Sequence, residues 1–476
     1  MNEDKTLGSG TEKSEADLLR ERLLRQTRHA CEVMNPAEIA AADAFCEGYK
    51  TFLNQAKTER EAAAFLLARA RALGFREFRP GDICRPGDKC YVNNRNKALI
   101  LAVAGKEPAE AGLRLTAAHI DSPRLDLKPS PLYEDKALIL GKTHYYGGIK
   151  KYQWAAIPLA LHGVVVKKDG TIVPVSIGED PADPKFCVTD LLPHLAAEQM
   201  KRTLDKGIQG EELNIIFGSR PILLDGKPEG FKLNILQILH ERYGITEWDL
   251  LSAELEAVPA FPACDVGLDR GMIGAYGQDD RVCAYPCAEA LFALEGVPDR
   301  TAVAVLADKE EIGSCGNTGL DTNFLLDFIT DLVLGQGGNP RVALRNTKCL
   351  SADVNAAFDP TFPGVMEPQN AAYCNLGVVV TKYTGARGKS GTSDAGAEFF
   401  AWVRNLLDEA GVLWQAGELG KVDEGGGGTV AVDLAKLNLD VIDIGVPILS
   451  MHAPFELAAK LDIAMLEKAC RAFYQS

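Results

Sequence analysis

The sequence predicts an α/β protein with a central sheet that helices cover on both faces and with a second, mainly β domain inserted into the chain. The first observation is the alternation of short apolar segments with longer amphipathic segments after residue 271. The second is a change of pattern over residues 128–270, where short β-prone pieces and turn signals replace that alternation. Alternating strands and helices of these lengths pack as a sheet between two helical layers.

The first part of the chain predicts helices followed by two strands. After a polar tail, SEADLLRERLLRQTRHACEVM begins at Ser14 with a helix-capping pattern, and further helix is expected to about Leu73. KALILAVAG at 97–105 and LRLTAAHID at 113–121 are short apolar segments separated by charged and glycine-containing residues. That pattern predicts two neighbouring strands.

A mainly β domain is predicted to interrupt the α/β domain. The segment HGVVVKKDGTIVPVSIG, residues 162–178, places a Lys-Asp-Gly turn between two β-prone pieces and predicts a hairpin. We therefore expect the first part of the α/β domain at 1–127, the insert at 128–270 and the second part of the α/β domain at 271–476. After the insert, strands are expected at 301–307, 348–353, 376–383 and 441–450, and helices near 282–295, 321–334, 394–409 and 455–475.

The composition is that of a globular protein and argues against some partners. The chain has 476 residues, 46% hydrophobic and 25% charged, with a formal net charge of −15 at pH 7. Nucleic acid and anionic membranes require a positive surface, so we expect neither as a primary partner. The sequence has no secretory signal pattern and no run of about 18 apolar residues, which predicts a cytoplasmic protein without a membrane span. The 12 cysteines lack C-x-x-C spacing and are expected to be thiols.

Polar residues collect where the expected strands end, which is where α/β sheets bind ligands. His119 and Asp121 in AAHID lie two apart on a strand and share a face, so the carboxylate can hold the imidazole ring. The other positions are Asp279 and Asp280 in GQDDR, Glu310 and Glu311 in ADKEE, Asp353 in CLSADV, and His452 in ILSMH. Each has a plainer explanation on its own, as a core histidine, a helix cap or a solvated charge.

Taken together, these residues suit a pair of metal ions. They supply two histidines, several carboxylates and no cysteine, and such ligands bind hard or borderline dications. Two ions that share a bridging carboxylate need about five such residues, which leaves one glutamate over. Adjacent glutamates on a tight turn point in different directions, so one of Glu310 and Glu311 can bind metal while the other is a free general base. The metal charge would also offset the repulsion between them.

The motifs that carry these residues are AAHIDSPRLDLKP, GQDDR, DKEEIGS, SADVNAA, GKSGTSDAGAEF and SMHAPFELAAKLD. In this order and spacing, over nearly the whole chain, they resemble the M18 family of dinuclear zinc aminopeptidases, whose best-known members are aspartyl aminopeptidases. The resemblance implies a zinc-exopeptidase fold, with a central mixed sheet sandwiched by helices and an inserted β-rich dimerisation domain. It also implies peptide substrates and a homododecamer built from dimers.

The resemblance implies a role for each polar residue at the strand ends. The implied ligands are His119 and Asp353 for one zinc ion, Glu311 and His452 for the other, and Asp279 as the bridge between the two ions. Asp121 would orient His119, and Glu310 would take the proton from the attacking water. Asp280 stands where many relatives have asparagine and is expected beside the ligands rather than among them. Cobalt or manganese could replace zinc, because such ligand sets accept all three.

Two further residues resemble family positions that act on the substrate. His194, in TDLLPHLAAEQM, resembles a histidine that reaches from the insert into a neighbouring subunit's active site and helps stabilise the transition state. Lys382, in VVVTKYTGARGK, lies in a segment that supplies a lysine for an acidic substrate side chain in aspartyl-specific relatives. The plainer alternatives are a surface histidine and a surface lysine. Acidic, neutral and basic first residues of the substrate therefore all stay open.

We expect a dinuclear zinc aminopeptidase that hydrolyses short peptides from the N-terminus. One alternative is a dimetal amidohydrolase acting on a non-peptide amide such as an N-acyl amino acid, and another is a non-catalytic scaffold stabilised by metal. A free Glu310 argues against the scaffold, because structural metal sites need no general base. The segment DEGGGGTVAVDLAKL lacks the ending of a phosphate-binding loop, so we expect its backbone to approach the active site closely before a helix.

Overall fold

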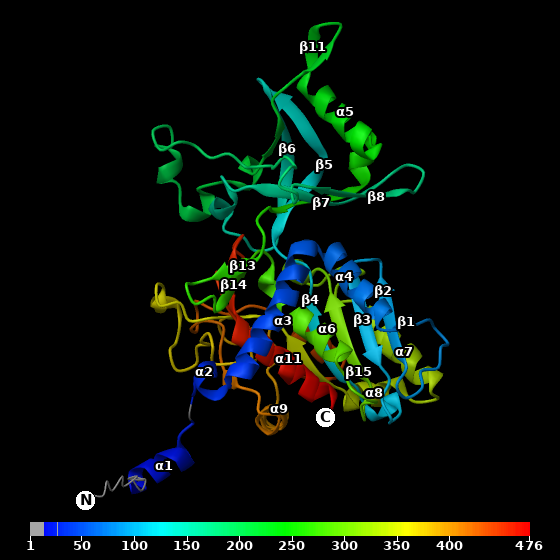
Figure 1. Ribbon diagram of the computed structural model, residues 1–476, viewed down its shortest axis with the longest axis vertical. Coiled ribbons are helices and arrows are strands. Elements are labelled where there is room, and N and C mark those ends of the chain that lie inside the picture. The colour runs from blue at the N-terminus through cyan, green and yellow to red at the C-terminus, as the bar shows by residue number, and fades with distance from the viewer. Residues whose placement is uncertain (1–13, 26) are drawn as a thin grey trace, which may run out of the picture.

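The centre of the molecule is a mixed sheet. The computed structural model describes residues 14–25 and 27–476, and within these residues the sheet has nine strands (Figure 1). In spatial order they are β1 (Arg76–Glu77), β2 (Lys89–Asn94), β3 (Ala98–Val103), β15 (Ala302–Ala307), β4 (Arg114–His119), β16 (Lys348–Ala352), β20 (Asp440–Gly445), β18 (Val378–Thr381) and β19 (Trp414–Ala416). The four strands β15, β4, β16 and β20 run parallel, so their carboxyl ends meet at one edge.

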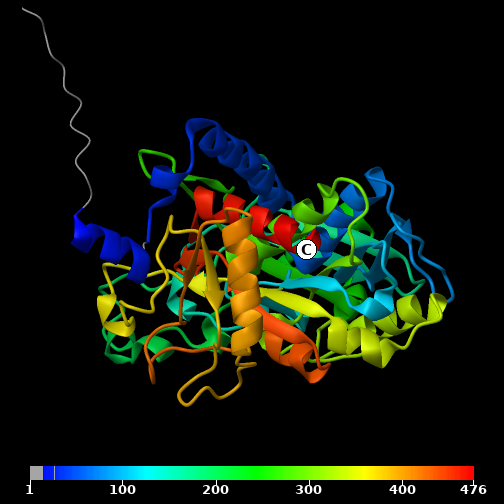
Figure 2. The same cartoon turned by 90° about the horizontal axis from the view of Figure 1, so that it is seen from below.

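Helices cover both faces of this sheet, as the alternation of strands and helices predicts. In β3, Leu99 and Leu101 belong to one buried cluster, whereas Ile100 and Ala102 between them belong to another. The first cluster contains buried residues of α3 (Pro36–Gln55), α4 (Glu59–Ala72), α6 (Gln278–Phe292), α9 (Ala397–Glu409) and α11 (Lys460–Tyr474). The second contains those of α7 (Phe324–Gly335), α8 (Pro340–Asn346) and α10 (Ala431–Lys436). Figure 2 shows α3 and α11 on one side of the sheet and α7 and α8 on the other.

The N-terminal helices begin at residues that cap them. Ser14 accepts a hydrogen bond from the backbone of Asp17 and caps α1 (Glu15–Leu23), as the sequence predicts. After the short α2 (Ala30–Val33), Asn35 and Thr58 start α3 and α4 with complete capping boxes. The expected end of the helical region near Leu73 is confirmed, since Leu73 is the C-cap of α4.

A second sheet, antiparallel, stands beside the first and is built from residues 124–259 (Figure 1). Its strands in spatial order are β8 (Ile172–Ile177), β7 (Leu159–Val166), β12 (Ala253–Pro259), β5 (Arg124–Asp135), β6 (Leu138–Tyr146) and β9 (Ile215–Gly218). The predicted hairpin at 162–178 is confirmed, because β7 pairs with β8 around a turn that Gly170 closes with φ +83°. The hairpin of β10 (Ile222–Leu224) and β11 (Lys227–Gly230) precedes α5 (Phe231–Tyr243).

A third, small sheet joins distant parts of the chain next to the carboxyl edge of the central sheet. It contains β13 (Cys264–Val266), β14 (Met272–Ala275), β22 (Glu456–Ala459), β21 (Pro447–Leu449) and β17 (Asn355–Ala356). The expected strand at 441–450 is therefore two strands, β20 and β21, in different sheets. The expected helix at 455–475 begins only at Lys460, because β22 occupies the residues before it.

The order of the central strands also differs from the prediction. β3 and β4 lie in one sheet but are not neighbours, because β15 pairs with both of them. The sequence of β15, AVAVLA, is apolar throughout and buried on both faces, which a central position requires. None of the described helices is long and apolar enough to cross a membrane. The cysteines are all free thiols, as expected.

Candidate metal centre

Three segments of the central sheet bring polar side chains to its carboxyl edge. His119 is the last residue of β4, Glu310 and Glu311 follow β15 in a short 3₁₀ helix at Glu310–Ile312, and Asp353 directly follows β16. Since β15 and β16 pair with β4 in parallel, the three strands end side by side. Residues that are up to 234 positions apart in sequence thus meet because of strand order alone.

Asp279 and His452 reach the same place from outside this sheet, and Glu456 holds both. Asp279 lies in the first turn of α6, where the backbone is not yet helical, and His452 lies between β21 and β22. The carboxylate of Glu456 accepts hydrogen bonds from the backbone N–H of Asp279 at 3.1 Å and of His452 at 2.7 Å. Glu456 is buried, and the sequence analysis did not predict its role. A glutamate at the start of an apolar strand, four residues after His452, could have indicated it.

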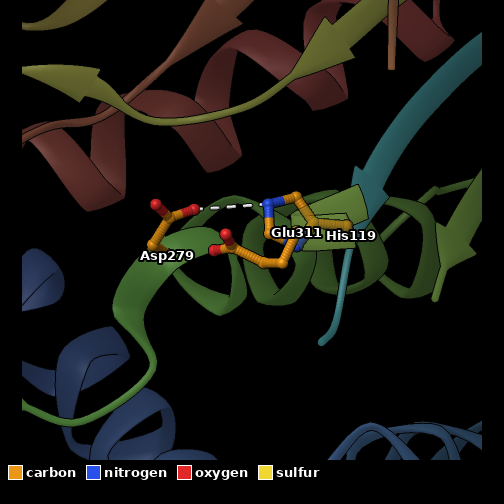
Figure 3. Close-up of side chains that lie close together, drawn as sticks. All are labelled: His119, Asp279 and Glu311. Carbon is orange, nitrogen blue, oxygen red and sulfur yellow. Dashed lines mark ion pairs between the residues drawn. The ribbon is translucent and has the colours of Figure 1, made fainter. Parts of the chain in front are cut away.

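The carboxylate of Asp279 lies between the two histidines. Its Oδ1 is 3.2 Å from Nε2 of His119, and its Oδ2 is 3.1 Å from Nε2 of His452. Figure 3 shows Asp279 and His119 joined by this contact, with Glu311 beside them. Although burial raises the pKa of Asp279, hydrogen bonds to both imidazoles lower it below its ordinary value. One carboxylate with a separate oxygen for each histidine is the arrangement that a bridging ligand needs.

The remaining acidic side chains lie close to the two histidines, His119 and His452. Oε1 of Glu311 is 3.4 Å from Nε2 of His452, and Oε2 of Glu310 is 3.8 Å from Nε2 of His119. Oδ1 of Asp353 is 4.0 Å from the same His119 nitrogen. The structure therefore brings together all five residues that the resemblance names as ligands, together with Glu310.

The residues of this centre form two groups that could each hold an ion. The first group consists of His119, Asp279 and Glu311, and the second consists of His119, Asp280 and Asp353. Within each group, the ligand atoms lie within 4.8 Å of one another. The second group contains Asp280, which the sequence reasoning places beside the ligands. Asp280 accepts a hydrogen bond from the backbone N–H of His119 at 3.3 Å through Oδ2. Its Oδ1 is buried and has no hydrogen-bond partner in the described part of the chain.

The charge balance of the centre favours bound cations. Burial, followed by the neighbouring charge of Asp279, raises the pKa of Glu311 far above its ordinary value. Burial, followed by the neighbouring charge of Asp280, raises the pKa of Asp353 far above its ordinary value as well. Burial raises the pKa of Glu310 to about 7. Oε1 of Glu311 is buried and accepts no hydrogen bond from a described residue. Imidazoles and carboxylates with unsatisfied oxygens are a donor set that fits zinc.

Asp121 contacts both His119 and the turn that carries Glu310 and Glu311. Nδ1 of His119 lies 3.3 Å from the Asp121 carboxylate and 3.1 Å from its backbone carbonyl, so Asp121 fixes the ring with Nε2 facing Asp279. The same carboxylate accepts hydrogen bonds from the backbone N–H of Glu310 and of Glu311, both at 3.2 Å. The position expected of Asp121, beside His119, is thus the one that the structure shows.

A cavity of about 510 Å³ opens onto the centre. Its described lining includes Glu310 and the glycines at 426–428, so the glycine-rich segment does approach the centre with its backbone before α10. Lys382 is exposed and is absent from that lining, and the same holds for His194 in the insert. The described residues that line it farther from the histidines include Asn355, Thr381, Thr384, Thr429 and Asp443, which the sequence reasoning did not single out.

Known proteins resemble this chain over most of its length. The family model described as aminopeptidase I zinc metalloprotease (M18) matches residues 52–474. A relative from Clostridium acetobutylicum, named "Probable M18 family aminopeptidase 1", is 47% identical over 95% of this chain and 98% of its own. The crystal structure of an M18 aminopeptidase from Thermotoga maritima has a TM-score of 0.90 at 43% identity, covering 95% of this chain and 99% of that one.

A more distant structure, titled the S. cerevisiae mApe1 dodecamer, has a TM-score of 0.74 at 20% identity over 90% of this chain and 96% of that one. At this identity the similarity shows the shared fold alone. The non-peptide amidohydrolase and the scaffold find no support among these proteins, whose names are those of aminopeptidases. The chain belongs to the M18 family of aminopeptidase I zinc metalloproteases, and its function is that of a zinc aminopeptidase.

Proposed function

We propose that each subunit holds two zinc ions, with Asp279 as the ligand that both ions share. The observation that carries this proposal is the position of the Asp279 carboxylate, with one oxygen 3.2 Å from His119 and the other 3.1 Å from His452. Asp353 would complete the site of His119, and Glu311 would complete that of His452. Asp280 is close enough to His119 and Asp353 to serve there as well.

The zinc ions, when bound, supply a Lewis acid that acidifies water and polarises the peptide carbonyl. Glu310 would accept the proton of the attacking water and pass it to the leaving amine. Its side chain is 18% exposed and lines the cavity, so it can reach both water and substrate. Burial raises its pKa to about 7, and the charge of bound zinc would lower it, so that the carboxylate is ionised and able to accept a proton.

Asp121 acts as a positioning residue. By accepting hydrogen bonds from the backbone of Glu310 and Glu311 and by holding the ring of His119, it fixes the metal ligands relative to the general base. A small error in that geometry would be costly, because proton transfer requires hydrogen-bond distance between base and water.

We further propose that the protein is a homo-oligomer assembled through the insert, up to the dodecamer that the resemblance implies. Apolar side chains are exposed in the insert around His194, namely Leu191, Leu192, Leu195, Met200 and Leu204. Exposed apolar clusters of this kind are typical of protein interfaces. His194 is exposed in the same segment, from which it could reach a neighbouring active site. Recognition of an acidic first residue by Lys382 stays a prediction.

The test of the function is the Glu310→Gln variant. We expect the rate of hydrolysis of alanyl p-nitroanilide to fall by at least about 1,000-fold, because the general base is lost. Metal analysis by mass spectrometry should still find two zinc ions per chain. The exposed Glu424, which pairs with Lys421 at 3.4 Å, provides the control variant Glu424→Gln, which should stay active. An N-acetylated substrate should not be cleaved. Full activity of Glu310→Gln would contradict the assigned base, and cleavage of the blocked substrate would favour the amidohydrolase.

A further inference from the structure

Cationic residues collect at the amino ends of the central parallel strands, at the edge opposite to the metal centre. Arg114 is the first residue of β4 and Lys348 is the first residue of β16, and the two are directly paired across the sheet. Arg300 lies two residues before β15, which pairs with β4 on its other side. Neighbouring strands are about 4.8 Å apart, so strand order brings these three cations together.

A pocket of about 460 Å³ opens at this edge. Its described lining consists of Ala111, Arg114, Arg300, Arg345, Asn346 and Lys348. Arg345 comes from the last turn of α8, which Figure 1 shows at the lower end of the sheet, away from the second sheet. Four of these lining residues are cationic and none is acidic, although the whole chain has a net charge of −15. Arg300 has a close acidic partner, Glu107, at 3.1 Å.

Neutral groups hold two of these cations in place. The guanidinium carbon of Arg114 and Nζ of Lys348 each lie 5.3 Å from the centre of the Trp402 ring. Nε of Arg114 also donates a hydrogen bond to the hydroxyl of Ser476 at 2.8 Å. An aromatic face and a hydroxyl orient a cation without cancelling its charge. The two side chains are therefore positioned for a further, anionic partner.

The positive charge of the pocket is largely uncompensated. Neither Arg114 nor Arg345 forms an ion pair with a described residue. Lys348 lies 3.7 Å from Asp440, whose side chain is 57% exposed, so water screens this pair. Burial, followed by the charge of Arg300, lowers the pKa of Arg114. Like charges on paired strand residues destabilise a sheet, and an anion between them would remove that repulsion.

We propose that Arg114, Arg345 and Lys348 form a binding site for a phosphate group, either of inorganic phosphate or of a small phosphate ester. Guanidinium groups match the oxygens of phosphate with two parallel hydrogen bonds, and an ammonium group adds a point charge. The pocket volume is that of a small-molecule site. Arg114 and His119 lie at opposite ends of β4, about 17 Å apart along the strand, so this site is separate from the metal centre.

The test is isothermal titration calorimetry of the zinc-loaded full-length protein at constant ionic strength, with inorganic phosphate and with glycerol phosphate. We expect one phosphate per chain to bind with a Kd below about 1 mM. In Arg345→Gln the Kd should rise at least tenfold, because charge-assisted hydrogen bonds are lost. Arg345 is exposed, so the variant should fold. The control is Arg341→Gln, at an exposed position of α8 outside the pocket lining, and its Kd should equal that of the wild type.

Tighter binding of glycerol phosphate would assign the site to phosphate esters, and tighter binding of inorganic phosphate would assign it to the free anion. A second measurement is thermal unfolding, in which phosphate should raise the Tm of the wild type and of Arg341→Gln but not that of Arg345→Gln. Lys348→Gln, on the neighbouring strand, should weaken binding as well.

Two results would overturn the site. One is the absence of saturable binding by the wild-type protein. The other is an equal Kd in the wild type, Arg345→Gln and Lys348→Gln, which would place the anion at the zinc ions or elsewhere. Hydrolysis of alanyl p-nitroanilide by Arg345→Gln without phosphate should match the wild-type rate, because the metal centre lies at the other edge of the sheet.

Discussion

The hydroxyl of Tyr146 donates a hydrogen bond to Oδ2 of Asp121 at a distance of 2.8 Å. Tyr146 ends β6 in the second sheet, whereas Asp121 follows β4 in the central sheet. The second sheet therefore contributes directly to the network that orders the metal centre. Gly148, just beyond β6, strengthens this connection, because its carbonyl lies 2.7 Å from Nδ1 of His452. The two sheets together fix both histidines.

Replacing Tyr146 with phenylalanine should slow catalysis without unfolding the protein. The variant removes one donor from the buried Asp121 carboxylate, a loss of about 1–2 kcal/mol, which corresponds to a fall in kcat of roughly 5- to 30-fold if Asp121 shifts. Steady-state kinetics and zinc content measure the effect. Tyr145→Phe, at an exposed position of the same strand, is the control and should behave as wild type. Equal kcat in both variants would show that the insert does not order the centre.

Substituting Gly445 with alanine should disrupt the position of Asp353. A Cβ at Gly445 would lie 1.7 Å from the backbone oxygen of Asp353, so the segment carrying this carboxylate must move. We expect loss of at least one zinc ion per chain and a fall in kcat/KM of about 100-fold or more. The control is Gly364→Ala, because a Cβ there meets no described atom within 4 Å. A fully metallated and active Gly445→Ala protein would contradict the role of Asp353.

Zinc should stabilise the folded protein. Burial raises the pKa of Glu310, Glu311 and Asp353, so their ionised forms are unfavourable unless a cation neutralises them. We expect removal of zinc by a chelator to lower Tm. Zinc at 100 times its Kd should restore about 2.7 kcal/mol of the free energy of unfolding for each ion bound. Thermal unfolding at increasing zinc concentrations measures this.

Two variants test whether stabilisation by zinc depends on Asp279. It should be strongly reduced in Asp279→Asn, which removes the shared ligand, and unchanged in Asp440→Asn, which alters an exposed carboxylate. An identical zinc response in Asp279→Asn would show that this carboxylate does not bridge the two ions.

His162 should make the contact between α4 and the second sheet sensitive to pH. Its ring lies 2.7 Å from Glu61 on α4 and 2.9 Å from Glu179 in the insert. Burial lowers the pKa of His162, but hydrogen bonds to Glu179 and Glu61 outweigh it and raise the pKa to about 9. Because this value exceeds the unfolded value of about 6.5, the contribution of up to about 3 kcal/mol is complete below pH 6.5 and is lost as pH rises through 9.

The measurement is Tm against pH for the wild type and His162→Gln. The Tm deficit of the variant should be largest at pH 6 and should shrink by pH 9.5. His144→Gln, at an exposed histidine of the insert, should show no such trend. A deficit that stays constant with pH would mean that His162 contributes packing rather than charge.

The elements that were predicted correctly are those with a strong local signal. β15 is an apolar run, β16 lies inside the segment expected as a strand at 348–353, and α1 begins at the expected capping residue Ser14. The split of 441–450 into β20 and β21 was not predicted, because the apolar run is continuous and only the pairing partners differ. α10, although only six residues long, is the helix expected after the glycine-rich segment.

The candidate ligands could be found because each follows a strand or opens a helix, a position that has a sequence signal. Asp443 could not be found in this way, since it lies inside β20, where a single acidic residue in an apolar run carries no sign of what it faces. Tyr146 has no local signal either, because its partner Asp121 lies 25 residues away on another sheet.

The sequence by itself determined the family, the layered α/β arrangement and the residue types that can hold two zinc ions, because motifs and periodicity are local properties. Only the tertiary structure decided that β15 lies between β3 and β4, that Glu456 holds Asp279 and His452, and that Asp443 faces the substrate cavity. These relationships depend on strand pairing across many residues, where the free energy of packing the whole sheet, not the preference of any short segment, selects the neighbours.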